Sequence, residues 1–332
     1  MAASGWQRSF ASVLVAASLC LPPTQQAWAD GVSFATVDGR SATVEQVLQA
    51  KGGPKELSED DIRGVQQAFL AFDAKQLKTA KALFSKGIEK WVELQRPRDE
   101  IVALIMARGN VLVDLKQFDA ALTDYDSAIA LMEPDGMITE TGLARYKEFP
   151  NAFVQRGLAW EGKAKWDLAV EDYSKAIDMW GGGRGDGINP YVLTFRGNAL
   201  TQLGEYGRAV KDYEAASDRF LSMRDKQNAA EARANLALAL YEVGQTEEAV
   251  KIMKSLVRKA GMADERSVDL HVALASHYFQ EGDRSSADQE FNLACYASKT
   301  GCSKFYDMDW VQRIRRWPPS LVAPLKGYLG RS

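Results

Sequence analysis

The chain has 332 residues, of which 46% are hydrophobic and 26% are charged, as in an ordinary folded globular protein. Its formal net charge of −3 makes it a poor non-specific partner for nucleic acid or for an anionic membrane. We therefore expect no nucleic-acid partner.

The amino terminus is predicted to be a targeting segment. Residues 10–21 form an apolar run behind Arg8 that is too short to span a bilayer. Ala27-Trp28-Ala29 then forms a small-residue cleavage motif before Asp30. The alternative, an amphipathic first helix, would need a polar face, and the run has none. We expect residues 1–29 to be removed as a signal or lumenal targeting segment and no transmembrane span to remain.

Residues 30–60 are predicted to be a lead-in segment. Val44–Leu48 has the composition of a short helix, which Gly52-Gly53-Pro54 would end. The sequence leaves open whether this segment packs on the following domain or stays mobile.

One pattern of small and aromatic residues returns six times in the rest of the chain. A small residue is followed four positions later by a bulky residue and three positions after that by another, usually small, residue, and a further small residue lies twelve positions upstream. The six instances are Ala80/Phe84/Gly87, Ala121/Tyr125/Ala128, Ala169/Tyr173/Ala176, Ala209/Tyr213/Ala216, Ala249/Met253/Leu256 and Ala287/Phe291/Ala294. Small residues on either side of a tight turn let two antiparallel helices approach closely, while the bulky residue fills the space between them.

This pattern resembles the tetratricopeptide (TPR) repeat. The repeats, numbered one to six, begin near residues 61, 102, 150, 190, 230 and 268. The resemblance implies an all-α fold: a TPR superhelical solenoid of about six helix-turn-helix units over residues 61–301. Repeats two to four match best, and the outer repeats depart from the pattern, as terminal repeats of a solenoid often do.

Three recurring charges are predicted to join the helices of the central repeats. Arginine stands at position 7 and aspartate at position 23 of repeats two, three and four. The predicted ion pairs are Arg108/Asp124, Arg156/Asp172 and Arg196/Asp212. Exposed pairs of this kind stabilise a protein by only about 0.2–1 kcal/mol each.

Residues 302–332 are predicted to form a C-terminal cap and tail. Apolar residues at helical spacing over 308–314 indicate one helix, and Ser320 after Pro318-Pro319 is a candidate N-cap for a final short helix. We expect this capping helix to shield the exposed face of the last repeat.

Two cysteines remain once the leader, with Cys20, is removed. Cys295 and Cys302 lie seven residues apart, a rise of about 10.5 Å on an unbroken helix, so a disulfide requires the helix to end before Gly301. Glycine commonly follows a helix end, which makes the bridge feasible. The alternative is a buried Cys295 with a free Cys302.

The sequence offers no catalytic constellation. The only histidines, His271 and His277, are six residues apart and would face different directions on one helix, so they do not chelate a metal together. No nucleophile-elbow or zincin motif occurs. We expect no enzyme activity, no cofactor and no metal.

The lumenal-type leader, the central Arg-Gly and Asp-Tyr repeats and the terminal Trp-Pro-Pro segment together resemble the thylakoid lumen TPR proteins of plants, algae and cyanobacteria. The resemblance implies a chloroplast transit peptide and a non-catalytic scaffold that assists assembly or maintenance of photosynthetic complexes in the thylakoid lumen. One alternative is a bacterial periplasmic or secreted TPR adaptor of an envelope complex. Another is an enzyme with a TPR body.

In TPR proteins, positions 2, 5, 9, 12 and 13 of each first helix line the concave groove. Carried over to this chain, these thirty positions hold six carboxylates and no lysine or arginine, where composition alone would give about four cations. A groove of this kind suits a basic or neutral peptide segment with apolar anchors and argues against the cationic clamp that holds chaperone C-termini. The alternative is that the carboxylates only keep the surface soluble. The predicted partner-binding residues are Phe69, Phe72, Asp73, Asn110, Asp114, Glu161, Tyr191, Asn198, Glu231, Tyr241, Glu242, Asp269 and Phe279.

Overall fold

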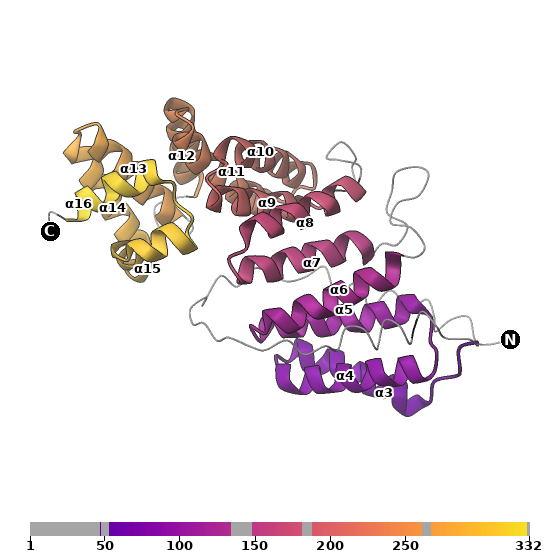
Figure 1. Cartoon of the computed structure of the whole chain (residues 1–332). Coiled ribbons are helices and arrows are strands. Elements are labelled where there is room, and N and C mark those ends of the chain that lie inside the picture. The colour runs from indigo at the N-terminus through magenta and orange to yellow at the C-terminus, as the bar shows by residue number, and fades with distance from the viewer. Residues whose placement is uncertain (1–46, 48–52, 134–147, 181–187, 261–266, 331–332) are drawn as a thin grey trace. The chain divides into compact units, whose positions relative to one another are not determined.

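The computed structural model describes residues 47, 53–133, 148–180, 188–260 and 267–330. The predicted leader and most of the predicted lead-in segment lie outside the described residues. Within the described ranges the chain is helical and contains no β-strand (Figure 1). None of the helices in these ranges has both the length and the apolar character needed to cross a membrane.

The chain divides into two compact units, Met1–Lys163 and Ala164–Ser332. The first unit contains α3 (Glu59–Asp73), α4 (Leu77–Glu93), α5 (Arg98–Asp114), α6 (Phe118–Met132) and α7 (Glu148–Gly162). Helices α3 and α4 pack as one hairpin and α5 and α6 as the next, while α4 contacts α5 and α6 contacts α7. The successive helices of this unit therefore stack as repeated helix pairs.

The second unit continues the same alternation and ends in shorter elements. Its long helices are α8 (Trp166–Met179), α9 (Pro190–Gln202), α10 (Tyr206–Ser222), α11 (Lys226–Glu242), α12 (Thr246–Ala260), α13 (Val268–Gln280) and α14 (Arg284–Ala297). Its terminal elements are α15 (Lys299–Ser303), η3 (Lys304–Tyr306), η4 (Trp310–Ile314) and α16 (Pro319–Leu329). The hairpins are α9/α10, α11/α12 and α13/α14. Helices α3, α5, α7, α9, α11 and α13 are the predicted first helices of the six repeats, so the predicted all-α fold is confirmed.

Close helix approach explains why small residues recur. A Cβ atom added to Gly109 would lie 2.6 Å from Cε1 of Tyr125, and one added to Gly197 would lie 2.7 Å from Cε1 of Tyr213. Tyr125 and Tyr213 are completely or almost completely buried. The ring of the second helix thus occupies the space that any side chain on the first helix would need.

The turn within each repeat places one residue in the left-handed backbone region. These six residues are Lys75, Lys116, Ala164, Gly204, Gly244 and Gly282, and each stands at position 15 of its repeat. At Lys116 the amide donates to Val113 O, and the next amide, of Gln117, donates to Leu112 O. This double hydrogen bond is the usual C-terminal closure of a helix and requires a positive φ, which glycine adopts most easily.

Substitutions at this turn position should have opposite effects at different repeats. Gly204→Ala should lower the free energy of unfolding by about 1–2 kcal/mol, because alanine is strained at a φ of 75° although nothing lies within 4 Å of its Cβ. Lys116→Gly should raise it by up to about 1 kcal/mol by relieving the same strain. Gly207→Ala is the control: this glycine lies within α10 with equal free space, and alanine there should stabilise the helix. Urea denaturation would measure all three, and a loss of stability in the control would contradict the explanation.

Two of the three predicted arginine–aspartate pairs form in the structure, and both are buried. Nε and Nη2 of Arg196 donate to both carboxylate oxygens of Asp212 at 2.8 and 2.7 Å, and Arg108 binds Asp124 in the same two-pronged way. Only 5% of Asp124 and of Asp212 is exposed. Burial raises the pKa of the Asp124 carboxyl, and the hydrogen bonds and charge of Arg108 oppose that rise. These pairs are therefore internal parts of the fold rather than weak surface contacts.

The same arginines also reach the preceding repeat. Nη1 of Arg108 donates to Ser85 Oγ of α4 at 3.1 Å, and Nη1 of Arg196 donates to Ser174 Oγ of α8 at 3.1 Å. Nη1 of Arg156 donates to Asp126 of α6 at 2.7 Å. We call these contacts between position 7 and position 25 of the preceding repeat the arginine ladder. Arg156 and Asp172 lie in different units, so their pairing stays a prediction.

Candidate partner-binding face

The predicted lining residues lie on the first helices of the repeats. In the first unit they belong to α3, α5 and α7, and in the second to α9, α11 and α13. We call this surface of the helices the first-helix face.

In the first unit the aromatic residues are partly built into the core. The ring of Phe69 packs edge-on against Phe84 with ring centroids 4.9 Å apart, and Phe72 is buried. Lys75 Nζ lies 5.4 Å from the Phe72 ring centroid and 3.1 Å from a carboxylate oxygen of Asp114. A lysine of the turn thus approaches a face whose lining positions hold none. Its place in the turn, outside the five lining positions, explains why the repeat pattern missed it.

Both predicted asparagines are bound to the second helix of their own repeat. The hydroxyl of Tyr125 donates to Asn110 Oδ1 at 2.8 Å, and that of Tyr213 donates to Asn198 Oδ1 at 2.9 Å. Asn198 is also buried. Their amide oxygens therefore serve to join helices, and their role toward a partner stays a prediction.

The predicted tyrosines of the second unit also pack against and bond to other residues of the fold. Tyr191 packs edge-on against Phe220 and its hydroxyl accepts from Asn228 Nδ2 at 2.8 Å. The Tyr241 hydroxyl lies 3.1 Å from Nδ1 of His277. Burial lowers the pKa of His277, and nearby Lys254 lowers it further while Glu281 opposes the shift. Tyr241 is thus a packing residue of α11, with its hydroxyl bonded across to α13.

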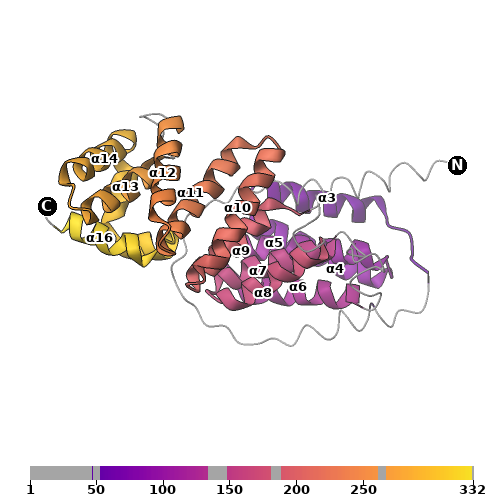
Figure 2. The same cartoon turned by 90° about the horizontal axis from the view of Figure 1, so that it is seen from above.

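The C-terminal segment, residues 304–330, lies on the first-helix face of repeats five and six. Helix α16 packs against both α13 and α11 (Figure 2). The backbone N–H of Ser320 donates to Glu242 Oε2 at 3.0 Å, and Ser276 Oγ donates to the carbonyl of Leu321 at 2.6 Å. Arg315 forms an ion pair with Asp269. Three lining positions therefore bind this segment, with charge or hydrogen bonds.

The contact also includes buried apolar side chains. Leu321, Val322 and Leu325 of α16 are at most 5% exposed, and the Phe279 ring packs against Tyr328 with centroids 5.8 Å apart. Burial lowers the pKa of Arg315 to about 10, the neighbouring charge of Arg316 adds to the shift, and Glu231 opposes it. Glu231 and Asp269, both at position 2 of their repeats, thus act on the same arginine.

The predicted final helix exists, but its predicted N-cap is wrong. The N-cap of α16 is Pro318, not Ser320, whose backbone amide is instead held by the Glu242 carboxylate. The helix packs on α13 of the last repeat, as expected, and it also contacts α11 of repeat five. Ser276 bonds to Leu321 across 45 positions and Glu242 to Ser320 across 78, separations that no local sequence pattern reveals.

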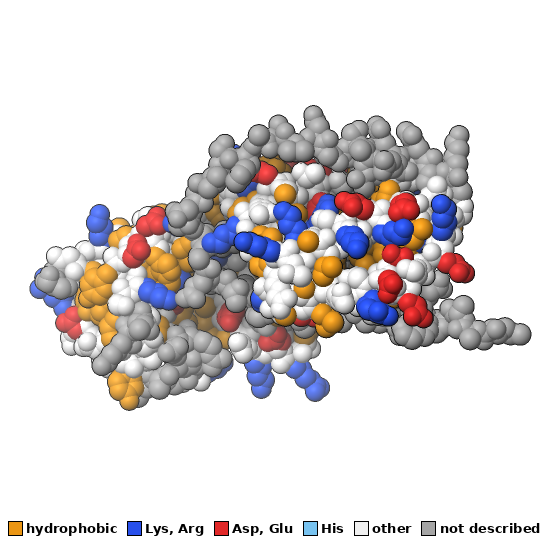
Figure 3. Space-filling view, turned by 90° about the horizontal axis from the view of Figure 1, so that it is seen from below, with side chains coloured by type: hydrophobic (Ala, Val, Ile, Leu, Met, Phe, Trp, Pro, Cys, Tyr) orange, Lys and Arg blue, Asp and Glu red, His pale blue; other side chains and the backbone are white. Residues whose placement is uncertain are grey.

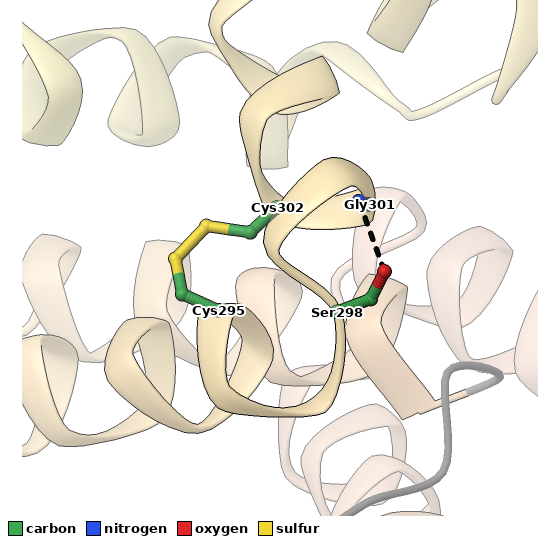
Figure 4. Close-up of a disulfide and its surroundings, with 4 residues drawn as sticks. All are labelled: Cys295, Ser298, Gly301 and Cys302. Carbon is green, nitrogen blue, oxygen red and sulfur yellow. Dashed lines mark hydrogen bonds between the residues drawn. A yellow bond between two sulfur atoms is a disulfide. The ribbon is translucent and has the colours of Figure 1, made fainter.

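Cys295 and Cys302 form a disulfide that joins α14 to α15 (Figure 4). Helix α14 ends at Ala297, and Ser298 is extended, with φ −155° and ψ 112°, which brings the two Cα atoms to 4.8 Å. The Ser298 hydroxyl accepts from the Gly301 amide at 3.1 Å and caps α15. The helix therefore breaks before Gly301 as the bridge requires, although the break lies at Ser298 and Gly301 belongs to the next helix.

One of the two histidines forms a buried contact with a carboxylate. Nδ1 of His271, which is buried, lies 2.6 Å from a carboxylate oxygen of Glu290. Within the described part of the chain no group of three or more residues is arranged to hold a metal ion. On the face drawn in Figure 3, acidic and basic side chains are interspersed.

No protein-family model and no curated protein matches the chain. Solved structures do match it. The apo form of RapI has a TM-score of 0.59 at 12% identity, covering 81% of this chain and 94% of RapI. The TPR-like repeats of a putative kinesin light chain from Podosopora anserina give 0.51 at 12%, covering 61% and 95%. This chain has a TPR-type fold. BtubC from P. vanneervenii also gives 0.51, at 14% identity, covering 78% of this chain and 92% of that one.

Proposed function

We propose that the protein is a non-catalytic scaffold that binds a basic or neutral peptide segment with apolar anchors on its first-helix face. One observation carries this proposal. The chain's own C-terminal segment lies on that face in repeats five and six, with Arg315 on Asp269 and α16 supplying buried apolar side chains. The face can therefore hold a segment of this chemistry, and the TPR-type fold is consistent with such a role.

We further propose that the scaffold works in the thylakoid lumen, in assembly or maintenance of photosynthetic complexes. The predicted leader and the resemblance to lumenal TPR proteins support this location. A periplasmic or secreted adaptor is the second candidate, supported by the same leader. Two measurements would test these candidates. Sequencing the mature amino terminus from the native source should show cleavage after Ala29 in both cases. Cofractionation with thylakoids should occur only if the protein is lumenal.

Charge reversal on the first unit should separate partner binding from folding. Asp73→Lys with Glu161→Lys changes two lining positions of the first unit, whereas the lining positions that bind the C-terminal segment belong to the second. We expect a partner captured by the tagged wild-type chain to associate with this variant at least about tenfold more slowly at low salt, because complementary charge mainly sets the encounter rate.

The matched control is Glu214→Lys with Asp218→Lys. Both residues are exposed on α10, a second helix, and the charge change is identical. Association should slow much less in this control. Equal effects of the two double variants would mean that net charge, not the first-helix face, governs binding.

A further inference from the structure

We infer that the C-terminal segment is an intramolecular ligand of the acidic first-helix face of repeats five and six, and that the Cys295–Cys302 disulfide controls its release. The inference rests on the proposed function, because it assumes that this face binds segments of the same chemistry. It adds a regulator, thiol–disulfide exchange, and a ligand class, an arginine followed by apolar residues.

The segment's contacts are those of a bound peptide. Arg315 forms an ion pair with Asp269 and is also attracted by the charge of Glu231, so one cation interacts with the position 2 carboxylates of two adjacent repeats. Glu242, at position 13, then holds the amide of Ser320. An arginine-containing partner that used these carboxylates would first have to displace the segment.

The disulfide lies at the base of this segment. It closes a loop between residues seven apart, immediately before η3 begins the C-terminal segment. The bridge fixes α15 to the end of α14 at the point where the segment starts, so its loss removes a constraint on the docked geometry and should favour undocking. The covalent link to α14 through Ser298 remains, so reduction loosens the segment without detaching it.

A dithiol reductant can open the Cys295–Cys302 bridge by thiol–disulfide exchange. Cys302 is 4% exposed and Cys295 is more accessible, so the attacking thiolate forms a mixed disulfide at Cys295 while the Cys295–Cys302 bond breaks and Cys302 leaves as a thiolate that takes up a proton. The second thiol of the reductant then displaces Cys295. Two electrons pass to the protein, which ends with two thiols, and the reductant ends as a disulfide.

Hydrogen exchange on the full chain tests the release directly and requires no partner. Upon reduction by dithiothreitol, amides of residues 304–330, including that of Ser320, should exchange several-fold faster, whereas amides of α9 and α10 should not change. The Cys295→Ser, Cys302→Ser double variant should show the fast rates with and without dithiothreitol. Unchanged rates in residues 304–330, or an equal increase in α9 and α10, would overturn the inference.

A labelled peptide with the sequence of residues 309–321 tests whether the released face is a binding site. Fluorescence anisotropy should show binding to the reduced chain and to the double cysteine variant, and at least tenfold weaker binding to the oxidised wild type. Glu231→Gln with Asp269→Asn in the cysteine variant should abolish that binding. Faster exchange without peptide binding would overturn the ligand role, while the proposed partner binding on the first unit would be unaffected.

Discussion

Replacing Tyr213 by alanine is expected to lower the free energy of unfolding by about 3–5 kcal/mol. Tyr213 is 2% exposed, its ring fills the space against Gly197, and its hydroxyl donates to Asn198. Alanine would leave a cavity between α9 and α10 and an unsatisfied buried amide oxygen. Urea denaturation followed by circular dichroism would measure the loss.

Two control variants isolate the contribution of the buried ring. One removes only the hydroxyl of Tyr213, and the other removes a tyrosine that is exposed. Tyr213→Phe keeps the ring and should cost only about 1 kcal/mol for the lost hydrogen bond. Tyr296→Ala removes a tyrosine that is 71% exposed and should change stability by less than about 0.5 kcal/mol. Similar losses for Tyr213→Ala and Tyr296→Ala would contradict the assigned role of the buried ring.

Removing the carboxylate of Asp212 is expected to cost about 3 kcal/mol or more. The side chains of Arg196 and Asp212 are 20% and 7% exposed, so Asp212→Ala leaves a largely buried guanidinium without its carboxylate partner. The loss should appear as a lower urea midpoint. Lys175→Ala is a suitable comparison, because its pair with Glu171 lies at the surface and should contribute less than about 1 kcal/mol.

A double substitution tests whether the stranded charge causes that loss. Arg196→Met with Asp212→Leu replaces the buried pair by apolar side chains of similar size. It should recover most of the stability, because replacing both partners removes the cost of an uncompensated charge. A double variant as unstable as Asp212→Ala would show instead that the hydrogen bonds themselves, including the one to Ser174, provide the stability.

The repeat architecture could be predicted because its determinants are periodic. Gly197 and Tyr213 lie on adjacent helices of one hairpin, and their required proximity recurs in every repeat as a fixed spacing in the sequence. The pairing of Arg196 with Asp212 follows from the same spacing. The spacing alone does not predict that these pairs are buried. Burial makes them far more costly to break than surface pairs.

The residues of the candidate site could be predicted from the sequence, but their contacts could be predicted only in part. The lining positions were identified from the repeat, but the residue opposite Asp269 is Arg315, which lies after the last repeat and belongs to no period. Lys75 beside Asp114 was missed for a similar reason, since its position is in the turn. A pattern that describes single repeats contains no information on what the following segment contacts.

The arginine ladder has a consequence for how the protein opens. In repeat proteins stability is shared between each repeat and its interfaces with its neighbours, so stronger interfaces make adjacent repeats melt together. Arg196 ties α9 and α10 to α8, whereas Leu236 and Leu274 stand at the corresponding position 7 of repeats five and six. Fraying that starts at α14 can therefore pass through α11 without breaking a ladder contact, and should stop where Arg196 makes the next opening step break an internal ion pair.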